Sequence, residues 1–399
     1  MKIKVGIIYF GDIYDVNGIN FVTNLFVLGK DSFSRNNLYF NKIFSLNGVI
    51  DVDKTPTIKI GKNVNKKSYL LMRYIRTTFS KIFNSENKRN AWFKITNSII
   101  NPARTVIEKN IEEINKENVL IFQDIFTAYF FLKKEKHANT ILILHCESDP
   151  FEQLLKYYPS IVDTKYHEFL TQIKEYVYQK INKIVFLSKR ALNNNISEKT
   201  TFIYNGIPDL INHKYSIDTN YLNLVCVGSM SGHKGQELII DSLRYLRQNE
   251  LNMIKLYFIG SGPQENRLKE LAQKYKLEKF ITFYGIRNDV DILLEQMNVL
   301  ILPSKSEGMP LCIIEAMRQG MYILATNVGG ISEMIKESFG KFITRDPQNI
   351  AIAIRNILEG NINSNYKMNS REFYLKNFRL ETMIRRYSET IKEVYDENN

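Results

Sequence analysis

Short apolar runs alternate with segments of helical spacing along the whole chain. The runs are continuously hydrophobic, which is typical of strands buried on both faces of a parallel sheet. Strands that alternate with helices predict a parallel α/β fold. The predicted strands are 2–10, 119–123, 140–145, 183–188 and 201–205 in the first half, and 222–228, 254–260, 280–285, 298–303 and 321–326 in the second.

The two groups of strands are separated by a polar, turn-rich segment, 205–220. We therefore predict two Rossmann-like domains facing across a cleft, an N-terminal one over 1–205 and a C-terminal one over 206–379. Residues 380–399 predict a helix with one apolar face, which must pack on something and is expected to cross back to the N-terminal domain. That face carries Leu380, Met383, Ile384, Tyr387, Ile391, Val394 and Tyr395.

The stretch SEGMPLCIIEAMRQG, residues 306–320, follows a predicted strand and contains two carboxylates eight positions apart. Pro310 suits a first helical position and Gly320 suits a position just past a helix end, so LCIIEAM between them predicts a helix. Glu307 would then stand at the carboxyl end of the strand, where open α/β sheets bind ligands. Glu315 would lie on the second turn of the helix. Alone, each could equally be a solvated surface residue.

Glycine-rich turns join three of the predicted strands to helices. GSMSGHKGQELIIDSL (228–243) would point backbone amides at an anion, typically a phosphate, and Lys234 would add a positive charge. Residues 259–272 and the segment around Gly18 have the same strand–loop–helix character. His145 ends a strand, so it is a candidate ligand-binding group, although a single histidine is more often structural. Lys234 could likewise be an ordinary surface lysine.

Composition narrows the class of protein. The chain has 399 residues, of which 44% are hydrophobic, and three scattered cysteines, which favour a reducing compartment over a disulfide framework. The N-terminus predicts a strand and not a signal peptide, and no window reaches the ~20 apolar residues of a transmembrane helix. We therefore expect a cytoplasmic protein. Two Asp-x-Asp runs, at 51–53 and 289–291, do not predict a metal site, because the run at 289–291 has the pattern of a helix start with capping acids.

Positive charge is concentrated in one segment. The net charge is +12, and twelve Lys or Arg against one acid give +11 between Lys54 and Arg104. Such a patch indicates an anionic partner. Residues 66–83 predict a helix with an apolar face flanked by cations, which would either lie on an anionic membrane or pack on the N-terminal sheet. The first alternative would place the protein peripherally on the inner face of the cell membrane. No nucleic-acid-binding module is recognisable.

Five motifs in order give the C-terminal half a resemblance to retaining family 4 glycosyltransferases of the GT-B fold. They are VGSMSGHKG (227–235), FIGSGPQENRLKELA (258–272), FYGIRNDV (283–290), LPSKSEGMPLCIIEAMRQGMYILAT (302–326) and VGGISEMI (328–335). Glu307 and Glu315 match the Glu-x7-Glu motif of that family. The N-terminal half is similar more loosely, through Gly18, His145 and the turn at 203–207.

The resemblance implies a nucleotide-sugar donor, expected to be a UDP-sugar on family frequency, and no cofactor or metal. It implies that Glu307 contacts the donor sugar, Glu315 the ribose and Lys234 the diphosphate, and that His145 contacts the sugar. The remaining implied binding positions lie in the glycine loops, at the place that holds the base and at the helix start: Gly18, Gly228, Ile286, Arg287, Gly308, Met309 and Leu311.

One position departs from the family pattern. Gly-Ser-Met at 228–230 stands where many members have Gly-Arg-Leu, so a second phosphate-binding cation is missing, and Arg287 or Arg190 could replace it. The implied activity is retaining, metal-independent hexosyl transfer to a glycan, lipid-linked or protein acceptor in cell-surface polysaccharide or glycoprotein biosynthesis. Two alternatives remain: a nucleotide-sugar 2-epimerase of the same fold, and a non-catalytic glycan-binding partner of another transferase.

Overall fold

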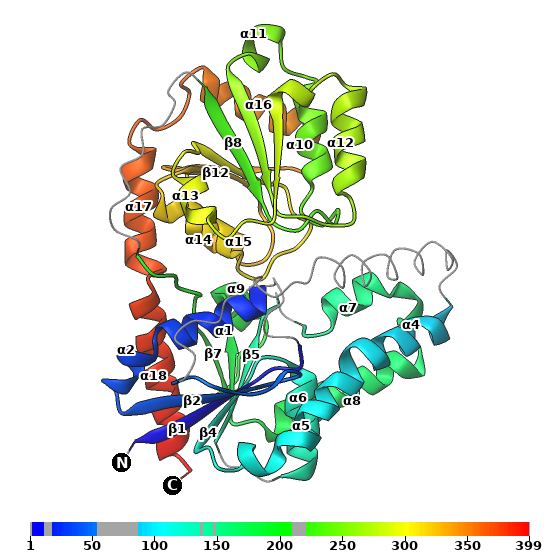
Figure 1. Ribbon diagram of the computed structural model, residues 1–399, viewed down its shortest axis with the longest axis vertical. Coiled ribbons are helices and arrows are strands. Elements are labelled where there is room, and N and C mark those ends of the chain that lie inside the picture. The colour runs from blue at the N-terminus through cyan, green and yellow to red at the C-terminus, as the bar shows by residue number, and fades with distance from the viewer. Residues whose placement is uncertain are drawn as a thin grey trace. The chain divides into compact units, whose positions relative to one another are not determined.

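The computed structural model describes residues 2–11, 18–53, 87–135, 139–146, 149–209 and 221–398. Within these ranges the chain forms two compact units, one made of 1–205 together with 380–399 and the other of 206–379. Each unit is a sheet with helices on both faces (Figure 1). The predicted pair of Rossmann-like domains is therefore confirmed as two α/β units. The predicted helix of residues 66–83 lies outside the described residues.

The described part of the first unit contains a seven-stranded sheet of order β3-β2-β1-β4-β5-β6-β7, in which the β2–β3 pair is antiparallel and the other pairs are parallel. Its strands are β1 Ile3–Ile8, β2 Leu38–Ser45, β3 Gly48–Asp51, β4 Val119–Phe122, β5 Thr140–Leu144, β6 Lys183–Phe186 and β7 Thr200–Phe202. Its helices are α1 Gly18–Leu28, α2 Lys30–Ser34, α4 Lys88–Ile95, α5 Asn101–Ile114, α6 Ile125–Lys134, α7 Glu152–Tyr157, α8 Lys165–Lys180, α9 Lys189–Asn193 and α18 Leu380–Asp396.

The described part of the second unit contains a six-stranded, wholly parallel sheet of order β10-β9-β8-β11-β12-β13. Its strands are β8 Leu222–Val227, β9 Ile254–Ile259, β10 Ile281–Gly285, β11 Val299–Leu302, β12 Tyr322–Thr326 and β13 Gly340–Ile343. Its helices are α10 Gln236–Leu243, α11 Gln248–Leu251, α12 Glu265–Lys274, α13 Val290–Leu294, α14 Leu311–Arg318, α15 Ile331–Met334, α16 Pro347–Leu358 and α17 Tyr366–Asn377. The strand order reverses direction at β8, and a ligand site is expected outside the carboxyl ends of β8 and β11.

The last helix completes the first unit. α18 contacts α2, β4 and β5, and it is the red helix beside the blue and green elements in Figure 1. Leu380, Met383, Ile384, Tyr387, Ile391 and Val394 are buried, as the apolar face predicted. The expectation that this helix returns to the N-terminal domain is confirmed.

No described helix has both the length and the apolar character needed to cross a bilayer. The cysteines Cys146, Cys226 and Cys312 are free thiols.

Candidate functional site

Two glycine loops meet backbone to backbone at the carboxyl ends of β8 and β9. Gly228 and Gly260 have φ values of +143° and +128°, which few residues other than glycine adopt. A side chain at Gly260 would collide with the Gly228 carbonyl. The Met230 amide donates to the Ser261 carbonyl at 3.0 Å. The predicted strand–loop–helix turn at 228–243 is confirmed, and it places Lys234 one residue before Gly235, the N-cap of α10.

Lys234, Ser304 and Glu307 form a polar cluster where these loops meet the loop after β11. Lys234 Nζ lies 2.6 Å from Glu307 Oε1, and the Ser304 hydroxyl donates to the same oxygen at 2.6 Å. The side chains of Lys234 and Glu307 are only 22% and 10% exposed. Oε2 of Glu307 has no hydrogen-bond partner among the described residues. Because an ammonium group carries three N–H donors, both partners keep hydrogen-bonding capacity for a ligand.

The charge of Lys234 is maintained by its neighbour. Burial acts to lower the pKa of Lys234, but the adjacent Glu307 carboxylate, both by its charge and by its hydrogen bond, outweighs burial and raises that pKa. The site therefore holds a fixed ammonium group in a partly desolvated position, where its attraction for a phosphate is stronger than at an open surface.

The start of α14 presents unpaired amides next to this cluster. Pro310 is the N-cap residue and Leu311 the first helical residue, so the prediction that Pro310 opens the helix was wrong by one position. The backbone amides of Gly308, Met309 and Leu311 have no hydrogen-bond partner in the described part of the chain. Pro310 adopts an extended conformation, with ψ of 119°. Gly320, with φ of +71°, follows the helix end as predicted.

Glu315 lies on the second turn of α14 in a different environment from Glu307. Burial raises the pKa of Glu315 to about 7, the Asp291 carboxylate adds to this rise, and Arg318 opposes it. Arg318 is 4% exposed and forms an ion pair with Asp291. The Glu315 carboxyl has no hydrogen-bond partner among the described residues. Its oxygens are therefore available to hydroxyl groups of a ligand.

Ile286 and Arg287 lie on the loop after β10, and both are exposed. The Arg287 guanidinium makes two hydrogen bonds to Asp289, of 2.7 and 2.5 Å. Asp289 is the N-cap of α13 but makes no side-chain cap bond, and Asp291 binds Arg318. The helix start predicted at 289–291 is confirmed, because Asp289 is the N-cap residue of α13, but its side chain makes no cap bond and both carboxylates bind arginines.

The loop that lacks the family arginine carries two serines instead. The hydroxyls of Ser229 and Ser231 lie 3.2 Å apart. Arg345, which follows β13, donates to the Pro303 carbonyl, and its guanidinium lies next to Gly235. Arg345 was not predicted from the sequence, because it follows an edge strand that the hydrophobic pattern did not predict.

His145 and Gly18 belong to the first unit. Gly18 begins α1, and His145 follows β5. His145 Nε2 lies 2.6 Å from Oε1 of Gln123, and burial lowers the pKa of His145 to about 4, so the imidazole is neutral near pH 7. Gln123 was also missed by the sequence analysis, although a polar residue that directly follows an apolar strand is a recognisable signal.

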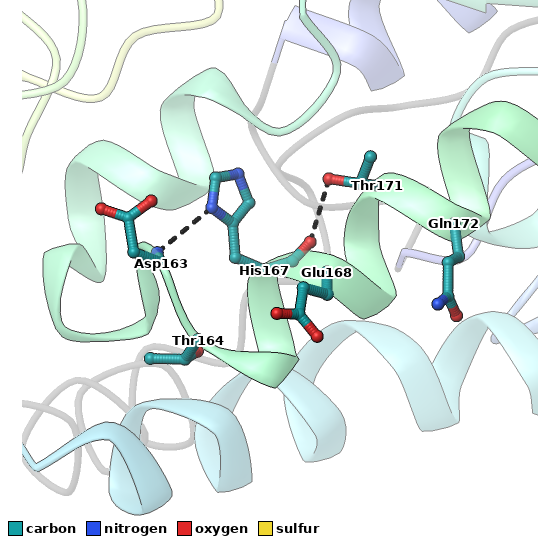
Figure 2. A pocket seen from close by; sticks show the side chains of 6 residues that line it. All are labelled: Asp163, Thr164, His167, Glu168, Thr171 and Gln172. Atoms are coloured by element: carbon teal, nitrogen blue, oxygen red, sulfur yellow. Dashed lines mark hydrogen bonds between the residues drawn. The ribbon is translucent and has the colours of Figure 1, made fainter.

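A shallow hollow of about 490 Å³ lies on α8, also in the first unit (Figure 2). The His167 ring accepts a hydrogen bond from the Asp163 amide at 3.3 Å, and the Thr171 hydroxyl donates to the His167 carbonyl at 3.1 Å. This hollow contains none of the predicted site residues, so we do not assign the functional site to it. Its lining is Asp163, Thr164, His167, Glu168, Thr171 and Gln172.

No group of three or more His, Cys, Asp or Glu suited to a metal ion is present among the residues that the structure describes. The Glu307 carboxylate forms an ion pair with Lys234.

Known proteins resemble this chain in sequence and in fold. The family model for glycosyl transferases group 1 matches residues 209–373. The putative colanic acid biosynthesis glycosyltransferase WcaL of Escherichia coli K12 is 28% identical over 33% of this chain and 34% of its own length. The Escherichia coli UDP-Gal:alpha-D-GlcNAc-diphosphoundecaprenol alpha-1,3-galactosyltransferase is 30% identical over 34% of this chain and 35% of its own length. The chain thus matches about a third of the length of these two curated relatives.

Solved structures match nearly the whole chain. The crystal structure of HepE from Anabaena, in complex with UDP-glucose, is similar with a TM-score of 0.67 over 98% of this chain and 99% of that one, at 14% identity. At this identity the likeness establishes the fold, which is the GT-B fold of two Rossmann-like units.

Proposed function

We propose that this chain is a glycosyltransferase that uses a UDP-sugar, because the family model for glycosyl transferases group 1 matches residues 209–373. The observation that carries the proposal is the cluster of Lys234, Ser304 and Glu307 beside the unpaired amides of α14. The names of the relatives support a place in bacterial polysaccharide biosynthesis. The acceptor that we propose is a glycan, carried on a lipid or on a protein.

In this proposal the diphosphate binds at Lys234 and at the first amides of α14. The two unused N–H donors of Lys234 neutralise charge on the leaving group. The free Oε2 of Glu307 accepts from a hydroxyl of the donor sugar, and Glu315 accepts from the ribose hydroxyls. Ile286 and the Arg287 backbone hold the base. The exposed Ser229 and Ser231 hydroxyls take the place of the arginine found in many family members.

We further propose that the transfer retains the anomeric configuration and needs no metal. The bond between the anomeric carbon and the diphosphate oxygen breaks, and the acceptor oxygen forms its bond on the same face. The acceptor proton passes to the departing diphosphate oxygen, so no separate base is required. Charge stabilisation by Lys234 and alignment of the two substrates then supply most of the rate.

The donor-binding assignment is tested by calorimetry with UDP and UDP-glucose. Glu315→Ala should weaken both ligands, because the ribose is common to them, whereas Glu307→Gln should weaken UDP-glucose and leave UDP largely unaffected. A lost hydrogen bond to a charged group corresponds to about 1.5–3 kcal/mol. Glu270→Ala, an exposed carboxylate on α12, is the matched control and should bind like the parent.

Activity is measured in the same protein as release of UDP from UDP-glucose, with and without a glycan acceptor. EDTA should leave the rate unchanged. If Glu315→Ala bound UDP as tightly as the parent does, Glu315 would not be part of the donor site. A rate abolished by EDTA and restored by manganese would overturn the metal-free reaction, and conversion of the sugar without release of UDP would favour an epimerase.

We also propose that the first unit attaches to an anionic membrane, which would bring the enzyme to a lipid-linked acceptor. The described end of the basic segment supports this: on α4, Phe93 is 68% exposed and is flanked by Lys88, Arg89 and Lys94. Trp92 stacks on Tyr166 at 4.8 Å, which anchors this helix to α8. Each cation near an anionic surface contributes about 1 kcal/mol to attachment.

Co-sedimentation with phosphatidylglycerol-containing vesicles tests the attachment. Binding should fall with added salt, and Phe93→Ser should reduce it several-fold because the exposed ring no longer enters the interface. Ile196→Ser, which removes a side chain that is 75% exposed elsewhere on the same unit, is the control and should have no effect. Equal recovery with anionic and neutral vesicles would favour a soluble acceptor.

A further inference from the structure

Two loops of the second unit touch backbone to backbone at Gly235 and Pro303. Gly235 has a φ of +77°, and a Cβ at this position would lie 2.5 Å from the Pro303 carbonyl oxygen, so the close approach requires glycine. The Lys305 amide donates to the His233 carbonyl at 2.9 Å and joins the same two loops. Together these two contacts form the loop junction.

The loop junction lies directly beside the polar cluster of the candidate site. Lys234 precedes Gly235 in the chain, and Ser304 follows Pro303. From opposite sides of the junction, the Lys234 and Ser304 side chains both bond Oε1 of Glu307, each at 2.6 Å. The separation of the Lys234 ammonium group from the Glu307 carboxylate therefore depends on how closely the two loops are held.

Arg345 reaches the loop junction from a third strand end. It follows β13, which is separated from β11 by β12 in the sheet. Its guanidinium donates to the Pro303 carbonyl, and Nη1 lies 3.1 Å from the position that a Cβ on Gly235 would occupy. The guanidinium therefore contacts both sides of the junction.

The Arg345 guanidinium is not held there by a surface ion pair. It forms none with a carboxylate of the described residues. Burial lowers the pKa of Arg345, which means that the charged side chain is partly desolvated. Because a desolvated charge without an opposite charge is unfavourable, this position calls for an explanation beyond surface solvation.

We propose that Arg345 is a positioning residue for phosphate binding, which holds the loop junction closed and thereby keeps Lys234 next to Glu307. This inference rests on the proposed transferase function and extends it by naming a residue that acts through Lys234. An ammonium group that is already in place binds a phosphate more tightly than one that must first be ordered. Arg345, Lys234 and α14 all belong to the second unit, so UDP tests the proposal within that unit.

Titrations of the full chain with UDP and with uridine, followed by ¹⁵N NMR, test whether Arg345 acts on phosphate binding. Arg345→Met should reduce the affinity for UDP by about three- to thirtyfold and leave that for uridine unchanged, because uridine has no phosphate. Arg345→Lys keeps one charged donor for the Pro303 carbonyl and should recover part of the loss. Lys341→Met, which removes an exposed cation from β13, is the matched control and should bind both ligands like the parent. A parent-like ratio of the two affinities in Arg345→Met would overturn the proposal.

A double-mutant cycle with Lys234→Met separates positioning from direct contact. If Arg345 acts through Lys234, Arg345→Met should cause little further loss of UDP affinity in the Lys234→Met protein. A loss as large as that in the parent background would show that Arg345 contacts the phosphates by itself, and the positioning role would be wrong.

Amide hydrogen exchange in the ligand-free protein tests the loop junction without a nucleotide. The Lys305 amide, which is bonded across the junction, should exchange faster by about tenfold or more in Arg345→Met. The Ile323 amide of β12, which donates to the Phe339 carbonyl at 3.1 Å, should keep the parent rate because the sheet stays intact. If the parent binds no UDP, the donor assignment fails, and exchange at Lys305 decides whether Arg345 holds the junction. Parent-like exchange at Lys305 in Arg345→Met would show that it does not.

Discussion

The two carboxylates of the Glu-x7-Glu motif differ in their hydrogen-bond partners. Glu307 is held by Lys234 and Ser304 through one oxygen, whereas Glu315 has a carboxyl without a hydrogen-bond partner in the described residues. Burial disfavours the charged form of Glu315 and raises its pKa to about 7. The carboxylate of Glu315 is therefore a strained group that a bound ribose would relieve.

Glu315→Gln should stabilise the ligand-free protein at alkaline pH. The folded pKa, about 7, is above the ordinary value of 4.5, so the carboxyl costs nothing below pH 4.5. The cost grows as pH rises from 4.5 to 7 and is complete above 7. Because one pKa unit corresponds to about 1.4 kcal/mol, the variant should gain on the order of 1–3 kcal/mol at about pH 8 and little near pH 5. Urea unfolding at the two pH values measures this difference.

Glu270→Gln is the control for that experiment, since its carboxylate is exposed, and it should follow the parent at both pH values. A Glu315→Gln protein that is only as stable as the parent at the alkaline pH would show that the carboxyl is not strained. The Glu315→Gln variant should also bind UDP more weakly. The Glu315 carboxyl would then lower the stability of the protein while it contributes to ligand binding.

At the scale of single residues, the sequence predicted the groups that carry charge but not their partners. Lys234, Glu307 and Glu315 were predicted from the motifs that carry the family resemblance. Gln123 and Arg345 were not, because each acquires its role from an atom that is distant in the sequence. Ser304 also was not, although its partner Glu307 lies only three residues later. Gln123, for example, bonds a residue 22 positions later. Such pairings depend on sheet order, which spacing does not encode.

At the scale of elements, the hydrophobic pattern located the buried strands and missed three others. The ten predicted strands all appear, within two residues of the predicted starts. β3 and β13 are short edge strands with several accessible positions, and β2 contains Asn41 and Lys42 within its apolar run. A continuous apolar run marks a strand covered on both faces, and β3 and β13 lack it. The glycine loops were predicted by type, but their mutual contact through Gly228 and Gly260 required the fold.

At the scale of the whole molecule, the chain closes its first unit with its last helix. α18 begins at Leu380, long after β7 ends at Phe202, yet its apolar face is buried against the first unit. Tyr387 is fully buried and meets the Phe26 ring at a centroid distance of 4.8 Å, and Glu393 pairs with Lys183 at 2.6 Å. Folding of this unit therefore depends on both ends of the sequence.

Tyr387→Ala should destabilise the first unit selectively. Removing a buried aromatic side chain costs roughly 3–5 kcal/mol, and the cavity would lie between α18 and α1. Hydrogen-exchange mass spectrometry should show lost protection in residues 1–205 and 380–399, while 206–379 keeps its protection.

Tyr387→Phe is the matched variant: the Tyr387 hydroxyl is buried without a hydrogen-bond partner in the described residues, so its removal should be neutral or stabilising by about 1 kcal/mol. Met368→Ala, on an exposed position of α17, controls for substitution in the second unit. Equal loss of protection in both units would contradict the assignment of α18 to the first unit.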